Sequence, residues 1–228
     1  MLGTYELLDR LTADFPHVLF EGCSGGGGRF DAGMLYYTPQ IWLSDDTDAI
    51  ERLKIQGGSS YGYPVSVMGS HVSAAPNHQT GRTTPLATRG VVAMSGAFGY
   101  ELDLRKVPAD EKAVIKQQIE RYHQDEDLIH DGLYYRLTDI ASGLYYTAWQ
   151  VVSEDRSRSL VNLVLTHTQP NPAPLHVRLK GLDPDALYRI EEEDRVISGK
   201  ALMYGGYTYP TLLGDYPSVQ LHLTRTER

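Results

Sequence analysis

The hydrophobic pattern of the chain changes near residue 131, and this change limits the folds that the chain can adopt. Before that point, short apolar runs typical of strands alternate with amphipathic stretches typical of helices, which predicts an α/β arrangement around a parallel sheet. After it, apolar residues recur with a period of two, as in Leu175, Val177 and Leu179, and this period indicates short antiparallel strands. We therefore expect two domains, residues 1–130 and residues 131–228, the second an antiparallel β-sandwich.

The first part of the chain begins with a predicted helix. Leu7, Leu8 and Leu11 share one face of this helix, which ends at Phe15-Pro16. Further along, β-prone runs predict strands and a charged amphipathic segment predicts a long helix. The strands are expected at 17–21, 39–44 and 63–73, and the helix at 110–124.

The composition favours a folded protein that acts on neutral ligands. Of the 228 residues, 41% are hydrophobic and 22% are charged, and the net charge is -8. Such a chain can bury a core, and its negative charge argues against nucleic acid or an anionic membrane surface as a partner. The single cysteine, Cys23, excludes an intrachain disulfide, and no apolar run is long enough to span a bilayer. Because the first residues lack the features of a secretory leader, we expect a soluble, cytoplasmic protein.

Four successive glycines, Gly25 to Gly28, follow the first predicted strand. Backbone N–H groups without neighbouring side chains can approach a ligand closely, so the run fits a ligand cradle as well as it fits a flexible turn. A phosphate site is disfavoured because the loop has no Gly-Lys-Ser/Thr sequence and does not open a helix directly after the strand. Cys23 has no neighbouring base that would make it a nucleophile.

Three aspartates, Asp45, Asp46 and Asp48, crowd the turn after the second predicted strand. Asp48 has the position of a helix N-cap, with Glu51 three residues later, and Asp46 can solvate the turn. Mutual repulsion predicts a raised pKa for at least one of these carboxyls, which a general acid near neutral pH requires. The sequence assigns no structural role to Asp45. Since α/β enzymes place catalytic groups at the ends of strands, Asp45 is the candidate acid.

Two histidines and a tryptophan are weaker candidates. His71 and His78 are seven positions apart, which fits no usual zinc spacing, so hydrogen-bonding roles are favoured over metal binding. Trp42 could stack on a sugar face, although aromatic residues are more often part of a core. We predict neither a metal site nor a cofactor.

Three long motifs occur in order along the chain. They are Cys-Ser-Gly-Gly-Gly-Gly-Arg-Phe-Asp from Cys23, Pro-Gln-Ile-Trp-Leu-Ser-Asp-Asp-Thr-Asp from Pro39, and His-Val-Ser-Ala-Ala-Pro-Asn-His-Gln from His71. Together they resemble the α-galactosidases of glycoside hydrolase family 36, and the likeness extends from the first residues to at least Leu187. The resemblance implies the C-terminal part of a TIM (β/α)8 barrel followed by an antiparallel β-sandwich.

The resemblance also implies roles for particular residues. Asp45 matches the general acid/base of the family, and Cys23, Ser24, Gly25 and Gly26 match the loop that contacts galactose. The nucleophile of the family lies in a Lys-Trp-Asp segment, which this sequence lacks. A complete barrel takes about 250 residues, so residues 1–130 can supply only its last units.

The function implied is retaining hydrolysis of terminal α-D-galactosides, such as melibiose and raffinose-type oligosaccharides. Retention requires two carboxyl groups about 5 to 5.5 Å apart, and one of the pair is missing here. We therefore expect a fragment of a longer enzyme that is inactive on its own. The alternative is a non-catalytic carbohydrate-binding or assembly fragment. The expected partner is a small galactoside, and the resemblance also suggests a homo-oligomer.

Overall fold

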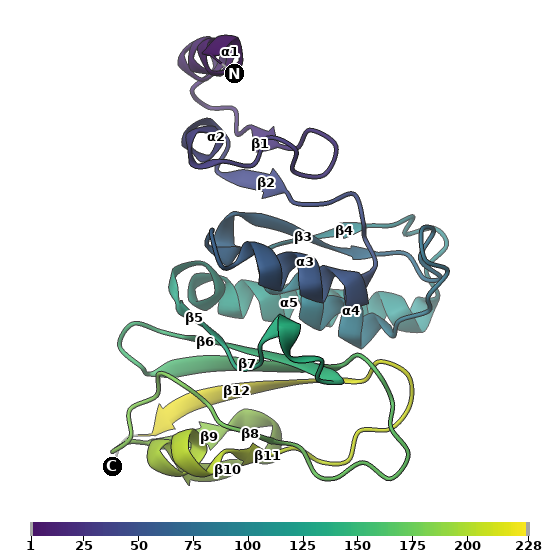
Figure 1. The fold of residues 1–228 in the computed structure, drawn as a ribbon, viewed down its shortest axis with the longest axis vertical. Helices are drawn as coiled ribbons and strands as arrows, with labels where there is room; N and C mark the ends of the chain where they lie inside the picture. The colour runs from purple at the N-terminus through teal and green to yellow at the C-terminus, as the bar shows by residue number, and fades with distance from the viewer. Residues whose placement is uncertain (1, 227–228) are drawn as a thin grey trace.

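The computed structural model describes residues 2–226, which are arranged in layers along one long axis (Figure 1). A parallel sheet belongs to the first part of the chain, and a larger antiparallel sheet belongs to the second. Helices α3 (Ala49–Ser59), α4 (Leu86–Ala93) and α5 (Ala109–Asp131) lie between the two sheets. The predicted α/β class and the change to antiparallel strands are both confirmed.

The parallel sheet has four strands in the order β1-β2-β3-β4. Because neighbouring strands are parallel, their carboxyl ends lie along the same edge of the sheet. The loops that follow the strands therefore come together at that edge. The strands are β1 (Glu21–Gly22), β2 (Gln40–Trp42), β3 (Met68–Ser73) and β4 (Ala97–Glu101).

The predicted strands of this sheet are longer than the observed ones. Residues 17–20 pair with no strand, since β1 is the edge strand and only Glu21 and Gly22 meet β2. Residues 43–44 continue past the end of β2 into the acidic turn. In the third region, a 3-10 turn (Val65–Val67) precedes β3.

The helices agree only in part with the sequence prediction. Helix α1 (Leu2–Asp14) forms where expected, but none of its residues is fully buried, and of its predicted apolar face Leu7 is exposed while Leu8 and Leu11 are partly buried. Helix α5 continues to Asp131, past the predicted end at residue 124. Neither α2 (Ala32–Tyr37) nor the pair α4 and β4 was predicted; α4 contains Gly90 and two valines, which have low helix propensity. No helix within residues 2–226 is long and apolar enough to cross a membrane.

Helices cover one face of the parallel sheet. Met68 of β3 packs with Ile55 of α3, and Val72 of the same strand packs with Ile115 of α5. Side chains alternate between the faces of a strand, so Trp42 and His71 lie on the opposite face, where both stay partly exposed. The sheet is thus anchored from one side and leaves its other side open.

The second part of the chain forms a six-stranded antiparallel sheet in the order β10-β9-β12-β7-β6-β5. A separate two-stranded sheet is made by β8 (His176–Val177) and β11 (Tyr207–Thr208). Short helical turns at Ile140–Ser142, Glu191–Glu193 and Ala201–Gly205 connect some of the strands. The six strands are β5 (Leu133–Arg136), β6 (Tyr146–Val152), β7 (Arg158–Leu165), β9 (Leu187–Ile190), β10 (Arg195–Ser198) and β12 (Ser218–Thr226).

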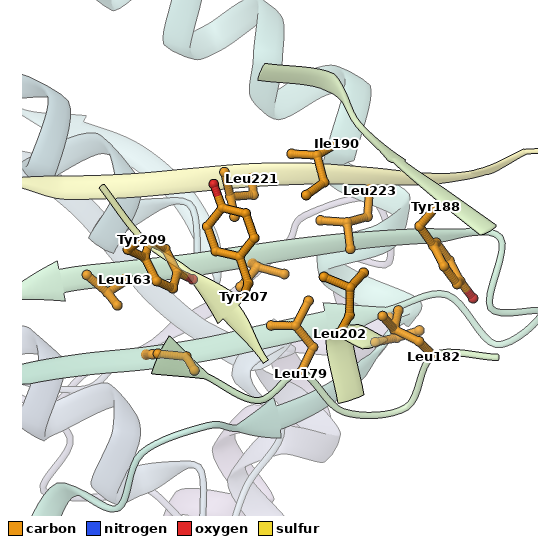
Figure 2. Close-up of a cluster of buried hydrophobic side chains, with 14 of the residues drawn as sticks. Leu163, Leu179, Leu182, Tyr188, Ile190, Leu202, Tyr207, Tyr209, Leu221 and Leu223 are labelled. Atoms are coloured by element: carbon orange, nitrogen blue, oxygen red, sulfur yellow. The ribbon is translucent and has the colours of Figure 1, made fainter. Parts of the chain in front are cut away.

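Both faces of the central strands are buried. Val164 of β7 packs with Ile50 of α3, whereas its neighbour Leu163 belongs to the cluster on the other face, which Figure 2 shows converging from several segments. The alternation predicted around Val177 and Leu179 is confirmed, because both side chains are buried in that cluster. The antiparallel sheet therefore has an apolar core of its own and also supports the helices.

Candidate active site

The two segments selected from the sequence lie at the carboxyl edge of the parallel sheet. The loop after β1 holds Cys23 to Gly28, and the turn after β2 holds Asp45 to Asp48. A third loop, residues 74–85, follows β3, the next strand in the sheet. This edge is where open α/β sheets bind ligands, so these three loops form the candidate active site.

Asp45 has an exposed side chain in the turn between β2 and α3. Within residues 2–226, no hydrogen bond or ion pair occupies its carboxylate. The other two aspartates are engaged, since Asp46 accepts a hydrogen bond from the backbone N–H of Asp48 at 3.0 Å and Asp48 caps α3. Asp45 is therefore the carboxylate of this turn that is available to a ligand.

Asp48 confirms the predicted N-cap. Its Oδ1 accepts hydrogen bonds from the backbone N–H groups of Ile50 at 2.8 Å and Glu51 at 3.2 Å, and its side chain also pairs with Thr80 and Arg82. Burial by itself would raise the pKa of Asp48, but these hydrogen bonds and the Arg82 guanidinium outweigh burial and lower the pKa. The rise expected from crowding thus does not occur at Asp48.

The glycine loop packs directly on the backbone of the acidic turn. Gly26 has a φ of +73°, and a Cβ there would lie 2.7 Å from the backbone nitrogen of Asp45. Gly27 has a φ of +86°, and a Cβ there would lie 2.7 Å from the carbonyl oxygen of Leu43. The run therefore permits close packing of the loop against the end of the strand, and it places the backbone of Gly26 beside that of Asp45.

Gln79, from the loop after β3, binds the other side of the same turn. Its Nε2 donates a hydrogen bond to the carbonyl oxygen of Asp45 at 2.7 Å, and its Oε1 accepts one from the backbone N–H of Thr47 at 2.9 Å. Asn77 adds a third bond, because its Nδ2 donates to Oγ1 of Thr47 at 3.0 Å. We call this arrangement of Gln79 and Asn77 the amide clamp.

Sequence reasoning missed the amide clamp. Asn77 and Gln79 flank His78 in the third motif, but the prediction assigned hydrogen-bonding roles only to the histidines of that motif. His78 is exposed, and the hydrogen bonds expected of it are made instead by the amides beside it. The signal that was available is the pair of amides two residues apart in a loop that follows a strand.

The rings of His71 in β3 and Trp42 in β2 pack against each other on the open face of the parallel sheet. Their ring centroids are 4.6 Å apart, and the buried Arg52 guanidinium lies 4.9 Å from the Trp42 ring. Burial lowers the pKa of His71, although the charges of Glu101 and Glu21 oppose the change. The lowered pKa favours the neutral imidazole, which packs against Trp42 from the neighbouring strand.

Two family models of glycoside hydrolases match the chain. Residues 1–132 match the family model for melibiases, and residues 146–223 match the model for the glycosyl hydrolase family 36 C-terminal domain. The two models therefore match successive parts of the chain. The chain belongs to glycoside hydrolase family 36, which includes the α-galactosidase AgaA.

Several α-galactosidases are similar over the whole chain. The bifunctional α-galactosidase/sucrose kinase AgaSK of Mediterraneibacter gnavus is 51% identical over 224 residues, which is 98% of this chain and 24% of the relative. The α-galactosidase AgaA of Geobacillus stearothermophilus is 50% identical over 228 residues, 100% of this chain and 31% of AgaA. This chain therefore spans 24% and 31% of the length of these two relatives.

Solved structures of the same enzymes have the same fold. The galactosidase domain of AgaSK superposes with a TM-score of 0.96 at 51% identity, over 99% of this chain and 31% of that structure. A variant of AgaA solved in complex with raffinose gives a TM-score of 0.96 at 49% identity, again over 99% of this chain and 31% of that structure.

Proposed function

We propose that residues 1–130 form the C-terminal part of a (β/α)8 catalytic barrel and that residues 131–228 form the β-sandwich domain after it. The open edge of β1 supports this proposal, as does the partly exposed face that carries Trp42 and His71. Parallel sheets are normally covered on both faces, and a barrel achieves this by closing the sheet on itself. Further strands beside β1 would bury both the edge and the open face.

The complete enzyme would hydrolyse terminal α-D-galactosides with retention of configuration. Asp45 would donate a proton to the departing glycosidic oxygen and then remove a proton from the water that hydrolyses the glycosyl-enzyme. The observation that carries this assignment is the exposed carboxylate of Asp45, which has no hydrogen-bond partner within residues 2–226, at a position where the Asp45 backbone nitrogen lies against the glycine loop. Raffinose, present in the AgaA complex, is an example of the substrate class.

The loop from Cys23 to Gly26 would bind the sugar. Gly25 is exposed, with no atom within 4 Å of the position of a Cβ, so its backbone is accessible to a ligand. The exposed thiol of Cys23 and the backbone N–H groups would contact galactose hydroxyls. Such contacts accelerate the reaction to the extent that they strengthen in the transition state.

A second carboxylate would act as the nucleophile, and the acidic turn offers none. Asp46 is hydrogen-bonded to Asp48, and Asp48 is buried and paired with Arg82. The attacking group would therefore come from a segment outside this sequence. We expect the 228-residue chain alone to be inactive toward galactosides.

A chimera tests the role of Asp45. This chain would replace the matching region of AgaA, to which it is 50% identical over 228 residues. In the chimera, Asp45→Ala should lower kcat/KM for melibiose by about 10²- to 10⁴-fold, the range for loss of general acid–base catalysis. A dinitrophenyl galactoside, whose leaving group needs no proton, should still form the glycosyl-enzyme, and azide should restore turnover.

The neighbouring carboxyl provides the control for this experiment. Asp46→Asn keeps an acceptor for the backbone N–H of Asp48 and should leave melibiose hydrolysis close to that of the unmodified chimera. Undiminished melibiose turnover in Asp45→Ala would remove Asp45 from the role. Calorimetry with galactose tests the non-catalytic alternative. A carbohydrate-binding fragment should bind galactose as an isolated chain without hydrolysing galactosides.

A further inference from the structure

We propose that Gln79 is a positioning residue, whose side-chain amide holds the backbone on both sides of Asp46 and so places the Asp45 carboxylate. The inference rests on the proposed role of Asp45 and adds a residue from a different loop to the site. It concerns how the acid is held, since the Gln79 side chain makes its hydrogen bonds to Asp45 and Thr47 of the acidic turn.

Both ends of the Gln79 amide are used. Nε2 donates to the carbonyl oxygen of Asp45 at 2.7 Å, and Oε1 accepts from the N–H of Thr47 at 2.9 Å. A side chain that binds a carbonyl and an N–H two residues apart acts like the backbone of an adjacent strand. The turn continues past the end of β2, so this side chain provides hydrogen bonds that the sheet does not.

Asp45 depends on such support because its carboxylate has no partner of its own within residues 2–226. The place of the acid is therefore set by its backbone. On the amino side, Gly26 packs against the Asp45 nitrogen, and Arg52 donates to the carbonyl oxygen of Ser44 at 3.3 Å. On the carboxyl side of Asp45, Gln79 holds the backbone through its hydrogen bond to the Asp45 carbonyl oxygen.

Gln79 is itself held in place by a buried amide. Its backbone N–H donates to Oδ1 of Asn77 at 2.9 Å, and the Asn77 side chain is buried and bound to Oγ1 of Thr47. The Thr47 carbonyl oxygen accepts from Oγ of Ser73 at 2.8 Å. The loop after β3 is thus fastened to the turn at several points, and Gln79 is the point closest to Asp45.

The expected consequence depends on the leaving group of the substrate. A poor leaving group, such as the sugar of melibiose, needs a proton from a correctly placed acid, whereas dinitrophenolate does not. A displaced Asp45 should therefore slow melibiose hydrolysis much more than cleavage of the aryl substrate. General destabilisation of the protein would lower both rates by the same factor.

The test uses two substitutions in the chimera with AgaA. Gln79→Ala removes both hydrogen bonds, and Gln79→Glu keeps the acceptor for Thr47 but turns a carboxylate oxygen toward the Asp45 carbonyl. Each should lower kcat/KM for melibiose by about 10- to 100-fold, as a misplaced catalytic group does. For the dinitrophenyl galactoside the loss should stay within about threefold, since proton transfer is not needed there.

Gln150 offers a matched control. Its Oε1 accepts from the backbone N–H of Lys180 at 2.8 Å and its Nε2 donates to Ser159 at 2.9 Å, all within the second part of the chain. Gln150→Ala should lower the thermal unfolding temperature and leave the ratio of the two substrate rates unchanged. In the 228-residue chain, hydrogen exchange should show faster exchange of the Thr47 N–H in Gln79→Ala.

A double variant separates the possible failures. If Gln79 acts through Asp45, Gln79→Ala should have little further effect on melibiose when Asp45 is already alanine. The positioning role would be overturned if Gln79→Ala lowered both substrate rates equally or lowered neither. This conclusion holds if Asp45→Ala still slows melibiose hydrolysis much more than cleavage of the dinitrophenyl galactoside. If Asp45→Ala itself showed no dependence on the leaving group, the proposed function would fail first.

Discussion

A methyl group at Gly26 should displace the acidic turn, whereas the same group at Gly25 should not. Both glycines have left-handed backbones, with φ of +73° and +64°. A Cβ at Gly26 would lie 2.7 Å from the Asp45 nitrogen and 2.9 Å from the Ser44 Cα, but a Cβ at Gly25 meets nothing within 4 Å. Gly25→Ala is therefore a control for conformational strain alone.

The difference in stability between the two variants follows from this geometry. Each alanine pays about 1 to 2 kcal/mol for a left-handed backbone and recovers about 0.4 to 1 kcal/mol through reduced freedom of the unfolded chain. These contributions cancel when the variants are compared. The steric conflict at Gly26 remains and should make Gly26→Ala less stable than Gly25→Ala by about 1 to 3 kcal/mol, the usual cost of overpacking.

Urea unfolding of the 228-residue chain, followed by tryptophan fluorescence, measures this difference. In the chimera with AgaA, Gly26→Ala should also reduce melibiose hydrolysis more than cleavage of the dinitrophenyl galactoside, because it moves the backbone of Asp45. Equal unfolding free energies would show that the loop does not pack on the turn as described. Full melibiose activity in Gly26→Ala would contradict the link between this packing and the acid.

Two further predictions concern charged groups that tie segments together. Asp48→Ala removes a buried cap and the ion pair with Arg82, whose longer ion pair with Glu51 remains. It should lower the free energy of unfolding by about 2 to 4 kcal/mol, and a loss below about 1 kcal/mol in urea titrations would speak against the cap. Burial alone would lower the pKa of His222, but hydrogen bonds to Asp125 and Glu192 raise it above its ordinary value. The charged ring should therefore stabilise the folded chain below the unfolded pKa of about 6.5, and this stabilisation should fade as the pH rises through the raised folded pKa. Relative to His222→Gln, the wild-type advantage in urea should be larger near pH 6 than near pH 9, and a pH-independent difference would refute the assignment.

Local chemistry allowed several features to be predicted from the sequence. The cap at Asp48 bonds N–H groups two and three residues ahead, so its whole geometry lies within a short segment. The period of two around Val177 and Leu179 predicts which side chains are buried, and this prediction does not require knowing which segment packs against them. The family motifs were also recognisable, because they are continuous in the chain.

Errors arose where an element depends on distant contacts. Helix α4 was missed because its stability comes from packing against β3 and α5, and the predicted strand at 17–21 was too long because only Glu21 and Gly22 find a partner. The incomplete burial of the apolar face of α1 has the same origin, since amphipathicity predicts a buried face but does not supply its partner.

By itself, the sequence determined the α/β class, the change to antiparallel strands, the N-cap of α3 and the membership of the chain in its family. Only the tertiary structure decided that the Gly26 backbone lies against the Asp45 nitrogen and that the Gln79 amide spans the turn from 34 residues away. The physical reason is that hydrogen-bonding patterns and periodicity act over a few residues, whereas contacts between loops depend on the order of strands in the sheet. That order places the ends of β1, β2 and β3 side by side, and with them the groups that hold Asp45.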